Sequence, residues 1–255
     1  MHKLYLLFIF LIVSCGGSGS SSSAESSSNN NSNNNTNSLS ETCEQQQINF
    51  KRCDFKHKEL DRYYLIQPPH LEAEGQSSVI FNLHGYGSNA FAQMEYTGLD
   101  NYTNTKENNF ILIHPQGAPL NTPLTSSSSH WNSGAWTIGS TVDDVDFIDT
   151  IIKLISQKYN INMNRIYATG MSNGGFMSYH LACNLSSKIA AVASVTGSMS
   201  KQTFESCNPE HPTAVLQIHG TIDGTVPYDG NSTIGMEPVE KVMTLWQEYN
   251  SCNTD

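Results

Sequence analysis

The sequence predicts a doubly wound α/β fold, in which a mostly parallel sheet carries helices on both faces. Short apolar runs such as residues 79–83 and 110–114 lack polar alternation, as strands buried on both faces do. Apolar residues recur at helical spacing over 142–155. Strand-like and helix-like segments then alternate along the chain, which is the order that βαβ units produce.

Each element has its own local signal. The first strand, 62–67, stops at Pro68-Pro69, and the helix over 142–155 has Thr141 and Asp144 at the spacing of a capping box. Composition and flanking turns predict further strands at 165–169, 190–195 and 214–219 and further helices at 173–182 and 239–249. We expect no internal repeat.

The N-terminus has the pattern of an export signal. Lys3 precedes a run of ten apolar residues, 4–13, which is too short to span a bilayer but suits a signal peptide. Cys15 ends this segment as in a bacterial lipobox, which predicts lipidation and anchoring to the outer membrane or cell surface; a plain secretory signal containing a cysteine is the alternative. Residues 16–40 are almost all Ser, Asn and Gly and predict a disordered tether. Residues 41–255 form the predicted domain.

Charge excludes one class of partner. The chain of 255 residues has 13 Lys and Arg against 23 Asp and Glu, a net charge of −10, which repels nucleic acid. Charged residues make up only 14 %, so Ser, Asn, Thr and Gln must supply much of the polar surface, as suits sugar ligands or an extracellular setting. The pattern implies no cofactor and no metal.

The motif Gly170-Met171-Ser172-Asn173-Gly174 stands between a predicted strand and a predicted helix. In that context G-x-S-x-G lifts a serine above the sheet on a sharp turn, whereas a chance pentapeptide would lack the flanking elements. Ser172 is therefore the predicted nucleophile. The backbone N–H of Asn173, at the helix N-terminus, is a predicted oxyanion-hole donor.

Two other strand ends complete the predicted site. The loop 84–87 follows a buried strand, and we assign its Tyr86 N–H as the second oxyanion donor, with His84 as a structural hydrogen-bonding residue. Asp223 follows the strand 214–219 and is the predicted acid that orients a histidine. A solvated turn residue is the alternative for Asp223. A denser carboxylate group is interpreted as helix caps rather than a metal site: Asp143, Asp144 and Asp146.

From residue 63 onward these motifs resemble the polyhydroxybutyrate depolymerase-like esterases, α/β-hydrolases that include feruloyl and acetylxylan esterases. The resemblance is carried by Leu83-His84-Gly85, Val142-Asp143-Asp144-Val145, Met171-Ser172-Asn173-Gly174-Gly175, His219-Gly220-Thr221-x-Asp223 and Val226-Pro227-Tyr228. It implies a secreted carboxylic ester hydrolase that forms an acyl-enzyme on a polyester or a plant polysaccharide ester. It also implies a substrate cleft lined by His130, Trp131 and Trp136, although the tryptophans could equally pack in the interior.

One part of the family pattern has no match. The family's catalytic histidine follows one more strand after the acid, and no histidine follows Asp223 here, so the base stays unassigned. The expectation is a C-terminally incomplete hydrolase whose final strand and histidine loop are missing; a natural pseudoenzyme is the alternative.

Cysteines suggest disulfides in an exported protein. After Cys15 five remain, and their positions suggest the pairs Cys183 with Cys207 and Cys43 with Cys53, free thiols being the alternative. Cys252 is then expected to pair beyond residue 255.

Two rival functions differ in class from an esterase. A non-catalytic, polysaccharide-binding hydrolase-like protein is compatible with the unassigned base. A serine peptidase of the same fold is less favoured, because no propeller or second domain is visible before the hydrolase segment.

Overall fold

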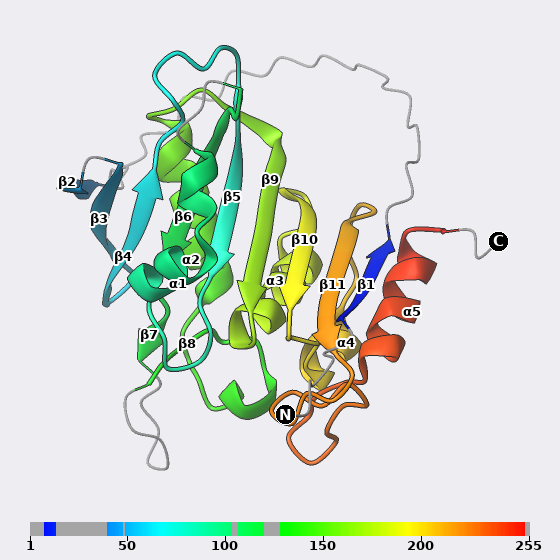
Figure 1. The fold of residues 1–255 in the computed structure, drawn as a ribbon. Coiled ribbons are helices and arrows are strands. Elements are labelled where there is room, and N and C mark those ends of the chain that lie inside the picture. Colours follow the sequence, from blue (N-terminus) through cyan, green and yellow to red (C-terminus); the bar gives the residue numbers. More distant parts are fainter. Residues whose placement is uncertain (1–7, 14–39, 48, 104–106, 120–127, 253–255) are drawn as a thin grey trace, which may run out of the picture.

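A computed structural model describes residues 8–13, 40–47, 49–103, 107–119 and 128–252 and confirms the predicted α/β class (Figure 1). Its nine-stranded sheet has the order β1-β11-β10-β9-β5-β6-β4-β3-β2. The central strands are mutually parallel, and their arrowheads point to the lower edge in Figure 1: β11 (Ala214–Gly220), β10 (Ile189–Val195), β9 (Ile161–Met171), β5 (Ser77–Leu83) and β6 (Phe110–Pro115). The carboxyl ends of these strands therefore meet along one edge, where ligand sites of such folds lie.

Antiparallel strands extend both sides of the parallel sheet. On one side lie β4 (Leu60–Gln67), β3 (Phe50–His57) and β2 (Glu41–Gln47). On the other, β1 (Phe8–Val13) pairs with β11. The apolar run that predicts a signal peptide thus supplies an edge strand in this structure, and its role in export stays a prediction. The predicted lipidation site and most of the predicted tether lie outside the described residues.

The helices lie on both faces of the sheet, as predicted. Helices α2 (Asp144–Ser156), α3 (Asn173–Asn184) and α5 (Val239–Tyr249) share the main hydrophobic core with Tyr64 of β4. Helix α1 (Ala90–Thr97) packs on Leu65 of the same strand. Because successive strand residues point to opposite faces, α1 covers the face opposite to the other three helices.

Helix α2 corrects the predicted cap. Its N-cap is Asp143, whose side chain accepts a hydrogen bond from the Asp146 N–H, so Thr141 and Asp144 do not form the predicted capping box. Asp144 is drawn into the interior by a buried arginine instead, which leaves the neighbouring aspartate to accept the helix N–H. The remaining short elements are α4 (Lys201–Ser206), β7 (Ala118–Pro119), β8 (Ser129–His130) and two 3-10 turns, Leu99–Tyr102 and Ala135–Thr137.

Both suggested cysteine pairs are disulfides. Cys43 and Cys53 face each other across β2 and β3, and Cys183 at the end of α3 bonds to Cys207 after α4. No cysteine in the described ranges is free, and Cys252 is also disulfide-bonded. The partner of Cys252 lies outside the described residues, so its expected pairing beyond residue 255 stays a prediction. Within the described ranges, no helix is long and apolar enough to cross a membrane.

His114 of β6 gives a first testable prediction, on stability. Its side chain is fully buried, and neither ring nitrogen has a hydrogen-bond partner among the described residues. Burial lowers the pKa of His114 from 6.5 to about 3. Between these values the unfolded chain binds a proton that the folded chain does not, so this contribution to stability is complete above pH 6.5 and is lost as the pH falls.

We therefore expect the stability of His114→Leu, relative to the wild type, to increase on acidification from pH 7 to pH 4.5. Urea unfolding at several pH values measures the difference. His211→Leu, which removes an exposed histidine, is the control. Parallel pH profiles for the wild type and His114→Leu would contradict the prediction.

Candidate active site

The predicted nucleophile, Ser172, lies on the turn between β9 and α3. Its backbone has φ +55° and ψ −119°, a conformation that a non-glycine residue rarely adopts. The flanking glycines permit the close packing that this turn needs, since a Cβ on Gly174 would lie 2.2 Å from the Leu83 carbonyl oxygen. A Cβ on Gly170 would lie 2.5 Å from the Gly174 backbone. This is the strained strand-to-helix geometry that the sequence motif predicts.

The loop after β5, which carries Tyr86, lies beside Ser172. A Cβ placed on Gly85 would be 3.7 Å from the Ser172 Cβ. The Gly85 carbonyl, which shares a peptide plane with the Tyr86 N–H, accepts hydrogen bonds from the His84 ring and from the Ser88 N–H. In a trans peptide the N–H points opposite to the carbonyl, so these two bonds fix the direction of the predicted oxyanion donor.

The tautomer of His84 follows from its partners. The Gly117 N–H donates to Nε2 at 2.9 Å, so that nitrogen is unprotonated and Nδ1–H donates to the Gly85 carbonyl at 2.8 Å. Burial lowers the pKa of His84 to about 4, which keeps the ring neutral at physiological pH. His84 thus has the predicted structural role.

The side chain of Asn173 is also fixed. Its backbone N–H lies in the first turn of α3, where the helix dipole favours negative charge. Its side-chain amide accepts from the Trp131 N–H at 2.7 Å and donates to the Trp131 carbonyl at 3.1 Å. The predicted oxyanion donor at Asn173 is therefore held rigidly at the end of β9.

The predicted acid, Asp223, lies in the loop after β11, at the same edge of the sheet. One carboxylate oxygen accepts from the Thr225 and Val226 N–H groups, at 2.8 and 2.9 Å. The other lies 3.8 Å from His219 Nε2. The same His219 nitrogen is 2.8 Å from the Val226 carbonyl oxygen, so His219 stabilises the loop that carries Asp223.

No histidine in the described ranges is hydrogen-bonded to Ser172. The buried histidines and the half-buried His180 have other partners or none: His57 with Asp146, His84 with Gly85 and Gly117, His130 with Ala118 and Ser140, His180 with Thr203, His219 with Val226, and His114 without one among the described residues. The base stays unassigned.

The three predicted cleft residues differ in how deeply they are buried. His130 and Trp131 are fully buried, so the expectation that they line a substrate cleft is wrong; hydrogen bonds inside the fold draw them into the interior. Trp136 is half-buried, with its ring centroid 6.4 Å from Tyr86 and 5.1 Å from Phe176. Tyr86 is 36 % exposed, so an aromatic surface lies next to the predicted oxyanion loop.

The carboxylates at the start of α2 all have side-chain partners. Asp143 pairs with Lys58, Asp144 with Arg62, and Asp146 with Lys58 and the His57 ring. In the described part of the chain, the one group close enough to hold a metal ion is Glu41 with Cys43 and Cys53. Both of its sulfurs are in a disulfide and carry no thiolate charge.

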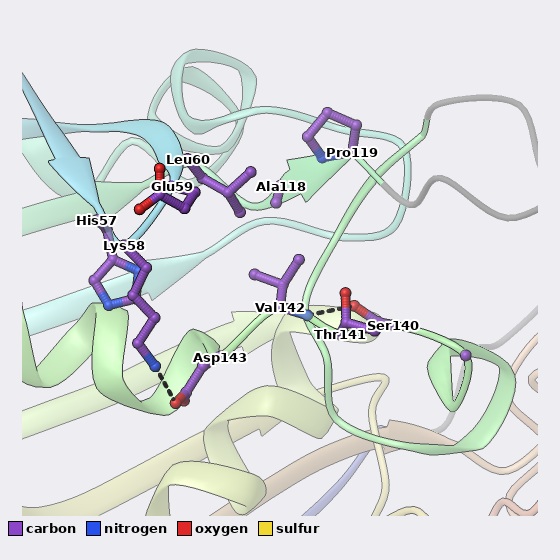
Figure 2. Close-up of a pocket in the computed structure, with 11 residues that line it drawn as sticks. His57, Lys58, Glu59, Leu60, Ala118, Pro119, Ser140, Thr141, Val142 and Asp143 are labelled. Carbon is purple, nitrogen blue, oxygen red and sulfur yellow. Dashed lines mark hydrogen bonds and ion pairs between the residues drawn. The ribbon is translucent and has the colours of Figure 1, made fainter.

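A hollow of about 620 Å³ lies beside the β3–β4 turn (Figure 2). Lys58 and Asp143 form an ion pair on one side, and Val142 and Pro119 face the space from others. None of the residues that line it belongs to the predicted site at Ser172.

Comparisons with known proteins agree with this geometry. The phospholipase/carboxylesterase family matches residues 65–250. Probable feruloyl esterase C of Aspergillus oryzae is 31 % identical over 183 residues, covering 70 % of this chain and 61 % of the relative. Feruloyl esterase B of Piromyces equi is 32 % identical over 168 residues, covering 51 % of this chain and 31 % of the relative. The chain thus spans about three fifths, or less, of these relatives.

A solved structure of a thermostable esterase shares the fold, with a TM-score of 0.51 and 19 % identity. The match covers 78 % of this chain and 52 % of that one.

Proposed function

Because the chain belongs to the phospholipase/carboxylesterase family, we propose that it is a carboxylic ester hydrolase with Ser172 as its nucleophile. The observation that carries the proposal is the strained backbone turn at Ser172. The turn lies beside the loop whose Tyr86 N–H is held in a fixed direction. Strain of this kind persists where surrounding structure enforces it, and it clusters at functional sites.

In the proposed reaction the Ser172 oxygen attacks the ester carbonyl carbon. The negative charge that develops on the carbonyl oxygen is stabilised by the N–H groups of Tyr86 and Asn173. Collapse of the tetrahedral intermediate expels the alcohol and leaves an acyl-enzyme, which water hydrolyses. Asp223 orients and stabilises the base that takes the serine proton.

We propose plant polysaccharide esters, feruloylated or acetylated, as the substrate class, with a polyester as the alternative. Two related proteins bear feruloyl esterase names. Tyr86 and the half-buried Trp136, which packs on the buried Phe176, offer aromatic rings next to the predicted oxyanion loop, which suits an aromatic acyl group or a sugar face.

A substrate panel tests both the activity and its class. We expect hydrolysis of p-nitrophenyl acetate and methyl ferulate, and none of peptide p-nitroanilides. Turnover of 3-hydroxybutyrate oligomers alone would move the substrate to a polyester. Absence of ester turnover together with absence of fluorophosphonate labelling would instead favour a non-catalytic, polysaccharide-binding protein.

We also propose that residues 1–15 direct export and that Cys15 is acylated. Two disulfides in the described domain support an oxidising compartment. In a Gram-negative host, Cys15→Ser is expected to shift the protein from the membrane pellet to the soluble or retained fraction, because the thiol that accepts the lipid is gone. Fractionation with and without detergent measures this. An unchanged distribution would exclude the lipid anchor.

A further inference from the structure

The two oxyanion donors of the proposed function come from elements far apart in the sequence, and one buried residue joins them through its side chain and its backbone. Trp131, directly after β8, is fully buried. Its indole Nε1–H donates to the His84 carbonyl at 2.8 Å, at the start of the loop that carries Tyr86. Its backbone N–H and carbonyl form the paired hydrogen bonds with the Asn173 amide.

From this geometry we propose that Trp131 is a positioning residue that fixes the separation and orientation of the Tyr86 and Asn173 N–H groups. The proposal rests on the proposed function, because it assigns a role within that oxyanion hole. Trp131 touches neither the nucleophile's hydroxyl nor any reacting atom in this arrangement; it acts through the two backbone segments that it connects.

The surroundings of Trp131 make the connection rigid. The His84 ring lies against the indole, with centroids 4.9 Å apart, and the same ring holds the Gly85 carbonyl. On the other side, the N–H of Asn132 donates to the buried carboxylate of Asp144 at 2.8 Å. Both ends of the Trp131 segment are thus tied to fixed groups, so a shift of the segment would move both oxyanion donors.

The rate of ester hydrolysis depends strongly on where the oxyanion donors lie. A single oxyanion donor typically contributes about 10²–10³-fold to kcat, and a misplacement of about 1 Å can cost about 10²-fold. A bulky aromatic side chain could fill the same space without any hydrogen bond. The specific feature of Trp131 is that its polar atoms reach both donor segments.

The test compares Trp131→Phe with Trp246→Phe. Trp246 is also fully buried, in α5, but its Nε1 has no hydrogen-bond partner among the described residues, so this control loses similar volume and no bond. We expect Trp131→Phe to lower kcat for p-nitrophenyl acetate by about 10-fold or more with KM within about twofold, and Trp246→Phe to leave kcat within about twofold.

A substrate with sulfur in place of the carbonyl oxygen distinguishes a positioning role of Trp131 from a general loss of structure. A thionoester places sulfur where the oxyanion forms, and sulfur gains less from N–H donors. A loosened hole should therefore lower the ratio of oxoester to thionoester kcat in Trp131→Phe alone. If Trp131→Phe does not fold, 3-benzothienylalanine at position 131, which keeps the ring shape and replaces the N–H by sulfur, takes its place.

Amide hydrogen exchange tests the proposal without turnover. We expect faster exchange at residues 85–87 and 173 in Trp131→Phe than in Trp246→Phe. Equal exchange and equal kcat in the two variants would overturn the positioning role. If the wild type hydrolyses no ester, the proposed function fails, while the exchange result still decides whether Trp131 holds these amides.

Discussion

In an enzyme that holds its catalytic base, Ser172→Ala is expected to lower kcat for p-nitrophenyl acetate by at least about 10³-fold, because the attacking oxygen is removed. The melting temperature should stay within about 2 °C of the wild type, since the hydroxyl caps no helix N–H and the methyl group needs no additional space. Initial rates and differential scanning calorimetry on the same preparations measure the two effects.

Ser206→Ala is the matched control for this prediction. Ser206 is an exposed serine at the end of α4, and its hydroxyl bonds only to the Gln202 carbonyl. Its loss should change neither rate nor melting temperature appreciably. Fluorophosphonate labelling should disappear in Ser172→Ala and persist in Ser206→Ala. Turnover in Ser172→Ala above about a tenth of the wild-type rate would place the nucleophile elsewhere.

The predictable features of this fold and site are those that neighbouring residues determine. The strand, the two glycines and the helix around Ser172 lie within one short segment, so the motif alone indicates the turn. The apolar runs of β5 and β6 and the helical spacing of α2 are likewise local patterns. Local signals predicted these elements because periodicity and turn chemistry need no knowledge of distant partners.

The features that sequence reasoning missed depend on residues far apart in the chain. The family resemblance assigned Trp131 to the substrate cleft, with packing in the interior as the alternative; its burial depends on Asn173, 42 residues later. Asp144 resembled a helix cap because it stands at the start of α2; its burial depends on Arg62, 82 residues earlier. A buried arginine in a strand with apolar neighbours was the available signal, since such a residue requires a carboxylate partner.

That pair gives the largest expected effect on stability. The Arg62 and Asp144 side chains are 3 % and 0 % exposed and lie 2.7 Å apart. The second Asp144 oxygen accepts the Asn132 N–H, and the guanidinium lies 3.7 Å from the centre of the Phe147 ring. Asp144→Ala would leave the Arg62 charge buried without its counter-ion. We therefore expect a loss of about 3–5 kcal/mol in the free energy of unfolding, measured by urea titration.

The adjacent aspartate supplies the matched control. Asp143 is 47 % exposed, caps α2 and pairs with the exposed Lys58. Asp143→Ala removes one cap and one surface ion pair, so we expect a loss of only about 1–2 kcal/mol. Equal losses at positions 143 and 144 would show that the interior does not penalise the uncompensated charge of Arg62.

A double variant distinguishes the destabilisation caused by an unpaired Arg62 charge from the stability that the Arg62–Asp144 ion pair contributes. In Arg62→Met with Asp144→Leu, no charge is buried, and apolar side chains occupy the space beside Phe147. If the penalty of Asp144→Ala comes from the unpaired guanidinium, this double variant should be more stable than Asp144→Ala, because both desolvation costs are absent. If instead the double variant is the less stable of the two, the hydrogen bonds from Arg62 to the Gln116 carbonyl and from Asn132 to Asp144 carry the stability, not the neutralisation of charge.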